Sequence, residues 1–145
     1  MTTVAVHEAA HAVVASALGV QVLYARIDGS DGGEFATARP FGELDVADHM
    51  ILALAGGVAT RQQFPESCGM DAVDVAHARL IASVMHGTRE ADPIVDDAIT
   101  AWRAVAAVFV QQEWRWIWAV AEKLSAHGRL SGEEIAAMRP RGRSW

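Results

Sequence analysis

Two histidines and a glutamate stand inside the first apolar segment of the chain, at a spacing that favours one local structure. The residues at 7–11 read His-Glu-Ala-Ala-His, within a stretch that predicts a helix over 4–18. Thr2 or Thr3 is the expected cap and Gly19 the expected stop. Positions i and i+4 of an α-helix lie one turn apart on the same face, so both imidazoles can bind one metal ion.

This H-E-x-x-H pattern predicts a catalytic zinc site. Zinc favours imidazole nitrogen and lowers the pKa of a bound water to roughly 7. We therefore expect Zn²⁺ as the cofactor, with His7 and His11 as ligands. Glu8 can reach the water without taking a ligand position, and would act as the general base during attack on a peptide carbonyl. The alternative is a surface helix with two exposed histidines and no metal.

A catalytic zinc ion needs a third protein ligand, with one position left for water. No histidine follows His11 until His49, so the third ligand must come from further along the chain. Cysteine and carboxylate side chains are also zinc ligands. The candidates are Glu43, Cys68, Asp71, Asp74 and His77.

Periodicity and turn signals predict a mainly helical chain with one small β-hairpin, forming a single domain over 1–145. Strands are expected at 20–27 and 34–39, joined by turn residues. Further helices are expected at 44–64, 71–86, 92–127 and 131–138. Asp92-Pro93 and the capping box from Ser131 to Glu134 mark helix starts, and Gly128 marks a stop.

Composition excludes several classes of protein. A formal charge of −6 argues against nucleic acid as a partner, because such binders present a basic face. The single cysteine excludes an internal disulfide framework and is typical of a reducing compartment. No basic leader precedes the first helix, and no uncharged apolar run approaches the roughly 18 residues of a membrane span. We therefore expect a cytoplasmic protein. The only lysine, Lys123, follows Glu122, so no Gly-Lys-Ser/Thr phosphate loop exists.

Four segments carry motifs in the order of a known family. They are Val-His-Glu-Ala-Ala-His-Ala-Val-Val at 6–14, Leu-Ala-Leu-Ala-Gly-Gly at 52–57, the stretch from Gly69 through Asp74 to Arg79, and the stretch at 116–138. The chain resembles the peptidase domain of the FtsH family of ATP-dependent zinc proteases, whose zinc helix reads H-E-A-G-H-A. The match covers nearly the whole chain in order and spacing. It implies a zincin-like helical domain.

The resemblance also implies the third ligand, because FtsH-type peptidases use two histidines and an aspartate. Alignment on Ala78 selects Asp74. Counting from Gly69 places that aspartate one residue late, which leaves Asp71 as the alternative; otherwise Asp71 is expected to cap the helix at 71–86. His77, one turn beyond Asp74, is expected behind the ligand or at the surface.

The family's ATPase module and membrane anchor are absent from this sequence. We therefore expect either a stand-alone relative or an excised domain, served by a separate ATPase partner or by none. Thr60-Arg61 also departs from the family, which usually carries acidic residues there. Endopeptidase action on unfolded or flexible polypeptide is the leading function.

The expected substrate site is the edge of the second strand. A protease must hold its substrate extended, and pairing the peptide with a strand edge does so. The residues expected to bind the peptide are Gly33, Glu34, Phe35 and Ala36.

Two other functions remain open. One is another H-E-x-x-H class with a downstream glutamate ligand, for which Glu43 is the candidate. The other is a non-catalytic zinc-binding module that recruits a partner through the tryptophan-rich helix. Trp114 and Trp118 lie off the main apolar stripe of that helix and would line a homo-oligomer interface. Asp45 and His49 are expected to form a solvated pair.

Overall fold

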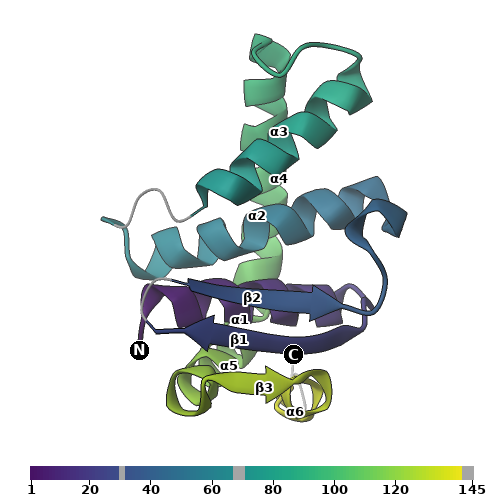
Figure 1. Ribbon diagram of the computed structural model, residues 1–145. Helices are drawn as coiled ribbons and strands as arrows, with labels where there is room; N and C mark the ends of the chain where they lie inside the picture. Colours follow the sequence, from purple (N-terminus) through teal and green to yellow (C-terminus); the bar gives the residue numbers. More distant parts are fainter. Residues whose placement is uncertain (30–31, 67–70, 142–145) are drawn as a thin grey trace.

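The computed structural model describes residues 1–29, 32–66 and 71–141 (Figure 1). Helices dominate, as the sequence predicts. The elements in chain order are α1 (Thr3–Ala17), β1 (Val22–Asp28), β2 (Gly32–Thr37), the 3-10 helix η1 (Phe41–Glu43), α2 (Val46–Gln63), α3 (Ala72–His86), α4 (Pro93–Gln112), α5 (Trp114–His127), β3 (Arg129–Ser131) and α6 (Gly132–Ala137).

Helix α1 is the centre of the molecule. Its residues from Val4 to Ala15 are all buried, which is typical of a helix covered on every side. Helix α2 packs on one side of α1 and α5 on another, while β1 and β2 cover a further face (Figure 1). His7, Glu8 and His11 therefore lie inside the core, not on a surface helix.

The sheet has three strands, so the expectation of a lone hairpin is corrected. Strands β1 and β2 form the predicted antiparallel hairpin, and β3 pairs with the other edge of β1, giving the order β2-β1-β3. Leu130 of β3 lies opposite Ala25, and both are buried. The sequence did not predict β3 because a strand of three residues is too short to show alternating hydrophobicity, and its partner β1 lies near the opposite end of the chain.

The single helix expected over 92–127 is two helices, α4 and α5, with a break at Glu113. Helix α4 packs against α2 and α3, whereas α5 packs against α1 and the sheet. One straight helix cannot reach both sets of partners, so tertiary packing overrides the continuous periodicity. The local signals at the ends hold: Asp92 accepts a hydrogen bond from the Ile94 amide at 2.9 Å, and Gly128 ends α5 in the left-handed conformation.

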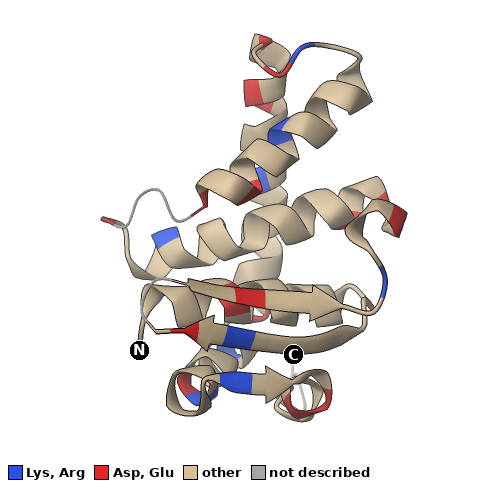
Figure 2. Ribbon diagram, viewed as in Figure 1, with Lys and Arg blue, Asp and Glu red and all other residues tan. Residues whose placement is uncertain are grey.

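Charged residues are spread over many elements, with acidic and basic positions side by side on the sheet (Figure 2). Arg26 of β1 illustrates this, because its guanidinium lies 2.6 Å from carboxylate oxygens of both Asp28 and Glu34. Among the helices that the structure describes, none is long and apolar enough to cross a membrane.

Candidate metal centre

Two helices that are distant in sequence bring three ligand-type side chains together. His7 and His11 come from α1, and Asp74 comes from the first turn of α3. The Oδ2 atom of Asp74 lies 2.9 Å from His7 Nε2 and 3.1 Å from His11 Nε2, and the two Nε2 atoms are 3.0 Å apart. Among the described residues, these three are the one group of at least three histidine, cysteine or carboxylate side chains that lie close enough together to hold a metal ion.

The donor set fits a divalent cation of the zinc type. Tetrahedral Zn–N and Zn–O bonds of about 2.0–2.1 Å place ligand atoms about 3.3 Å apart, which is within a few tenths of an ångström of the three observed distances. Two imidazole nitrogens and one carboxylate leave a fourth position open, as catalytic zinc sites do. Zinc itself remains our proposal, since the same donors suit other divalent metals.

A hydrogen bond orients the ring of His11 for this role. Its Nδ1 lies 2.8 Å from the carbonyl oxygen of Leu52 in α2. A carbonyl can only accept, so Nδ1 carries the proton, and in the neutral ring the Nε2 lone pair is directed at His7 and Asp74. Lone pairs on converging nitrogen and oxygen atoms at these distances require a cation among them, either a proton or a metal ion.

The electrostatics of the metal-free cluster follow from that convergence. Burial disfavours charge on both partners, but the hydrogen bonds from His11 and His7 outweigh it and hold the pKa of Asp74 well below its usual range. Burial likewise acts against the imidazolium of His11, yet the hydrogen bond and charge of Asp74 raise the pKa of His11. A cation placed among these atoms would replace the proton that they share.

Gly56 makes the close packing of α2 against α1 possible. A Cβ at Gly56 of α2 would lie 2.5 Å from His11 Nε2 and 2.8 Å from His7 Nε2. The sequence motif Gly-Gly is a visible signal at this position. It marks the close approach of a backbone to the ligands, a role that the sequence analysis missed.

Glu8 lies beside the ligands and is not one of them. It is buried, and that burial raises the pKa of its carboxyl although His11 and His7 oppose the shift. Its side chain packs against β2, where a Cβ at Gly33 would lie 2.8 Å from Glu8 Cγ. A carboxylate with a raised pKa beside an open ligand position is suited to accept a proton from water.

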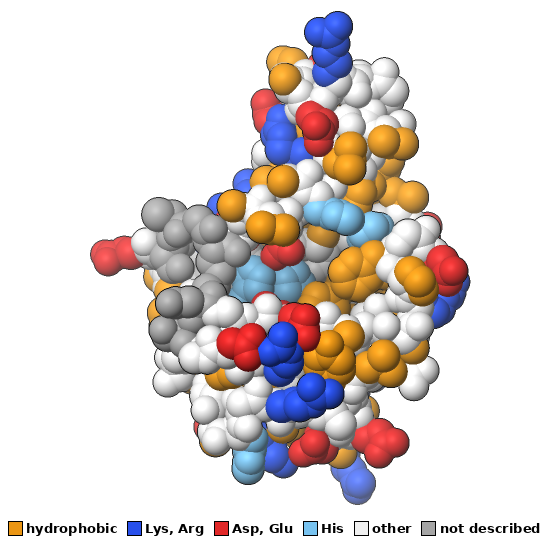
Figure 3. All heavy atoms as spheres, viewed as in Figure 1, with side chains coloured by type: hydrophobic (Ala, Val, Ile, Leu, Met, Phe, Trp, Pro, Cys, Tyr) orange, Lys and Arg blue, Asp and Glu red, His pale blue; other side chains and the backbone are white. Residues whose placement is uncertain are grey.

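Two hollows open on either side of Asp74. One, of about 310 Å³, is lined by Val4, His7, Glu8, Gly32, Gly33, Val73 and Asp74. The other, of about 210 Å³, is lined by His11, Phe35, Phe41, Leu52, Ala53, Val73, Asp74 and His77. Figure 3 shows histidine side chains in a depression of this face, with hydrophobic side chains beside them. The ligand cluster is therefore reachable from solvent through both hollows.

A chain of aromatic rings forms one wall of the second hollow. Phe35 stacks on His11 at 4.9 Å between ring centroids, and Phe41 follows Phe35 at 5.4 Å. His49 continues the chain, and its Nε2 lies 2.9 Å from Nε2 of His77. The expectation of a solvated Asp45–His49 pair is wrong, because His49 is buried and bonds across to α3. Burial and the nearby His77 lower the pKa of His49.

The other ligand candidates lie elsewhere. Asp71 occupies the position before α3, but its carboxylate makes no capping bond; it pairs with Arg61 at 3.0 Å. Glu43 is exposed and lies 3.9 Å from Arg39, so the alternative class with Glu43 as ligand finds no support. Cys68 lies outside the described residues.

The strand expected to bind substrate borders both hollows. Within the described part of the chain, strand β2 pairs with β1 alone and so lies at the edge of the sheet. Gly33 faces Glu8 and Phe35 faces His11, whereas the Glu34 carboxylate accepts hydrogen bonds from Tyr24 and Arg26. Ala36 pairs with Tyr24 in β1.

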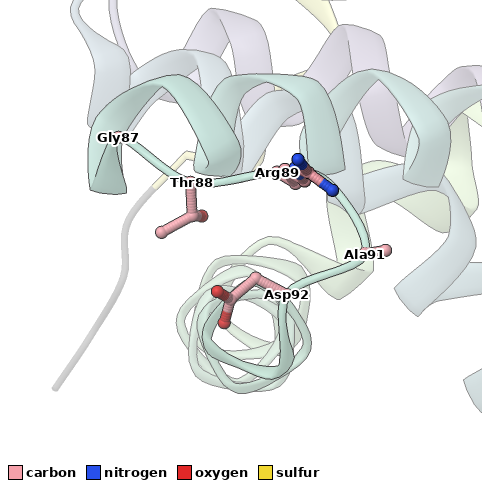
Figure 4. Close-up of a pocket in the computed structure, with 5 residues that line it drawn as sticks. All are labelled: Gly87, Thr88, Arg89, Ala91 and Asp92. Atoms are coloured by element: carbon pink, nitrogen blue, oxygen red, sulfur yellow. The ribbon is translucent and has the colours of Figure 1, made fainter.

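Hollows also occur away from the ligands. One lies in the turn between α3 and α4, lined by Gly87, Thr88, Arg89, Ala91 and Asp92 (Figure 4). Asp92 is already used as the cap of α4. Trp114 and Trp118, with ring centroids 6.0 Å apart, line another with Gln63 and Arg115.

A comparison with protein-family models finds no match to this chain, and a comparison with curated proteins finds none either.

Proposed function

We propose that the protein is a zinc-dependent endopeptidase. The observation that carries the proposal is the buried cluster of His7, His11 and Asp74 with Glu8 directly beside it, all open to hollows at a strand edge. The resemblance to FtsH-type peptidases and their zincin-like arrangement supports the same assignment. A purely structural metal site would have no use for the buried carboxylate of Glu8.

Each residue has a distinct task. His7, His11 and Asp74 would hold the ion, which supplies Lewis acidity to the scissile carbonyl and to water. Glu8 takes the proton from water on its carboxylate and passes it to the leaving amine. The hydrogen bond from His11 to the Leu52 carbonyl keeps that imidazole in the tautomer that binds a metal.

The substrate would lie extended between β2 and the start of α3. The free edge of β2 offers backbone groups for pairing, and Val73, 81% exposed, borders both hollows from the opposite side. Pairing through the main chain requires an unpaired substrate backbone, so unfolded or flexible segments are the expected substrates. The chain has no phosphate-binding loop, so its activity should not respond to ATP.

Metal analysis combined with proteolysis tests this function. The purified protein should carry close to one equivalent of zinc and cleave a casein-like substrate, and a chelator should abolish cleavage reversibly. Less than half an equivalent after native purification, or cleavage that persists in the chelator, would refute the proposal. Efficient cleavage of a stably folded reporter by this chain alone would contradict the proposed substrate class.

A further inference from the structure

Asp71 is a buried carboxylate that points away from the ligand cluster. It precedes α3, is 9% exposed, and directs its carboxylate at two arginines on other helices. Its Oδ2 lies 3.0 Å from Arg61 in the last turn of α2 and 3.8 Å from Arg103 in α4. Asp71 thus connects the start of α3 to both helices against which α3 packs.

Helix α2 is shaped to receive this carboxylate. A Cβ at Gly57 would lie 2.5 Å from Asp71 Oδ2 and 2.7 Å from Asp71 Cβ, so only glycine leaves room there. The preceding residue, Gly56, has the same relation to His7 and His11. The two consecutive glycines of α2 therefore leave room for the histidines of α1 and for Asp71 at the start of α3.

Among the described residues, the first turn of α3 has no fully buried side chain, and Val75 is its one hydrophobic residue that packs against the core. Its residues Ala72 and Val73 are exposed, and Asp74 and Val75 are only half-buried. The buried residues of α3, namely Ala78, Ala82 and Ser83, begin one turn later. The fully buried side chains thus lie in the middle of α3, whereas at the end that carries Asp74 the fully buried group is Asp71, with half-buried Val75 beside it.

We propose that Asp71, held by Arg61 and Arg103, is a positioning residue for Asp74. Its ion pairs fix the first turn of α3 so that Asp74 Oδ2 reaches both imidazoles at 2.9 and 3.1 Å. A metal site tolerates about 0.5 Å of misplacement, so loss of this anchor weakens metal binding although Asp71 is not a ligand. The inference goes beyond the proposed peptidase activity, because it concerns metal affinity and stands or falls without any hydrolysis assay.

The test compares metal affinity among variants of the full chain that each lose one carboxylate charge. Asp71→Asn keeps the size of the side chain and removes its charge, and should lower zinc affinity about 10-fold in a chelator competition. Asp74→Asn removes a ligand and should lower it well over 10-fold. The matched control is Asp96→Asn, which breaks the Arg79–Asp96 pair between α3 and α4 at 2.5 Å and should leave affinity unchanged.

Cobalt substitution separates positioning from general destabilisation. Co²⁺ bound to Asp71→Asn should keep the visible absorption intensity of a four-coordinate site, but its absorption bands should lie at other wavelengths than in the wild type. Co²⁺ bound to Asp96→Asn should give the wild-type spectrum. An Asp71→Asn protein that binds zinc within 2-fold of wild type, or an Asp96→Asn protein that loses as much affinity, would overturn the proposal.

A second variant keeps the proposal testable if Asp71→Asn does not fold. Arg61→Gln alters a side chain that is half exposed and leaves Asp71 in contact with Arg103. It should lower zinc affinity several-fold. Where Asp71→Asn folds, the double variant Arg61→Gln/Asp71→Asn should lose no more affinity than Asp71→Asn alone, because both changes break the same ion pair. Unchanged affinity in Arg61→Gln, or additive losses in the double variant, would contradict the role of this ion pair.

Discussion

Gly56 of α2 lies directly against His11 of α1, so closely that a Cβ at Gly56 would stand 2.5 Å from Nε2 of the histidine. The contact explains why a residue that weakens helices occupies the middle of a buried helix. Absence of a side chain at Gly56 leaves the imidazoles room to meet Asp74.

Gly56→Ala should therefore displace the histidines and lower metal affinity at least 10-fold, since ligand orientation at a metal site is sensitive to small shifts. Isothermal titration with zinc measures the effect. Gly42→Ala is the matched control, because a Cβ at Gly42 meets nothing within 4 Å. Equal affinities in both variants would show that the close packing at Gly56 does not restrain the ligands.

Glu8→Gln should abolish hydrolysis while keeping the metal, because it removes the base and no ligand. We expect kcat to fall at least about 100-fold.

The Glu8→Gln change should also raise the melting temperature of the metal-free protein at neutral pH. Burial raises the pKa of Glu8, so ionisation of Glu8 costs folding stability as the pH rises through that pKa, and the amide avoids this cost.

Calorimetry of the metal-free wild type and Glu8→Gln between pH 4 and 8 checks the sign. The difference in stability should grow with pH. Wild-type rates of casein cleavage by Glu8→Gln would refute the proposed mechanism, whereas a variant less stable than wild type at pH 8 would refute the electrostatic argument alone.

Acid should destabilise the metal-free fold through His49. Its pKa is lowered in the folded state by burial and by His77, so the unfolded chain binds a proton first as the pH falls below about 6.5. The free energy of unfolding that neutral His49 contributes is fully present above about pH 6.5, and it is lost as the pH falls from there through the lower pKa of the folded state. His49→Gln should show a shallower decline in urea-denaturation stability from pH 7 to 5, with His86→Gln, at an exposed histidine, as the control.

Trp116→Phe should destabilise the fold without affecting the metal. The indole Nε1 of this buried residue donates a hydrogen bond to the Ile135 carbonyl at 2.8 Å, which ties α6 to α5. Loss of the indole donor removes one of the two hydrogen bonds that the Ile135 carbonyl accepts, the other coming from the Met138 amide at 3.2 Å. This loss costs about 0.5–1.5 kcal/mol, and the cavity left by the smaller ring adds to it. Trp118→Phe, at a half-buried residue, should cost less in the same denaturant titration.

Local chemistry made the beginning of the site predictable from the sequence. His7 and His11 share a face because any helix places residues four apart in that way, and Glu8 is adjacent to His7 whatever the rest of the chain does. Asp92, Gly128 and the capping box at Ser131 also act within a few residues of themselves, so their predicted roles are found in the structure.

Contacts between distant segments decided the rest. Spacing left Asp71 and Asp74 as alternatives, because their difference depends on how α3 docks: Asp71 turns to Arg61 and Asp74 turns to the histidines. The break at Glu113 and the pairing of β3 with β1 arise from packing partners far along the chain, which no local periodicity records. The sequence by itself determined the helix that carries His7 and His11, and only the tertiary structure brought Asp74 to them, because the packing of α3 on α2 and α4 joins segments that are distant in the chain.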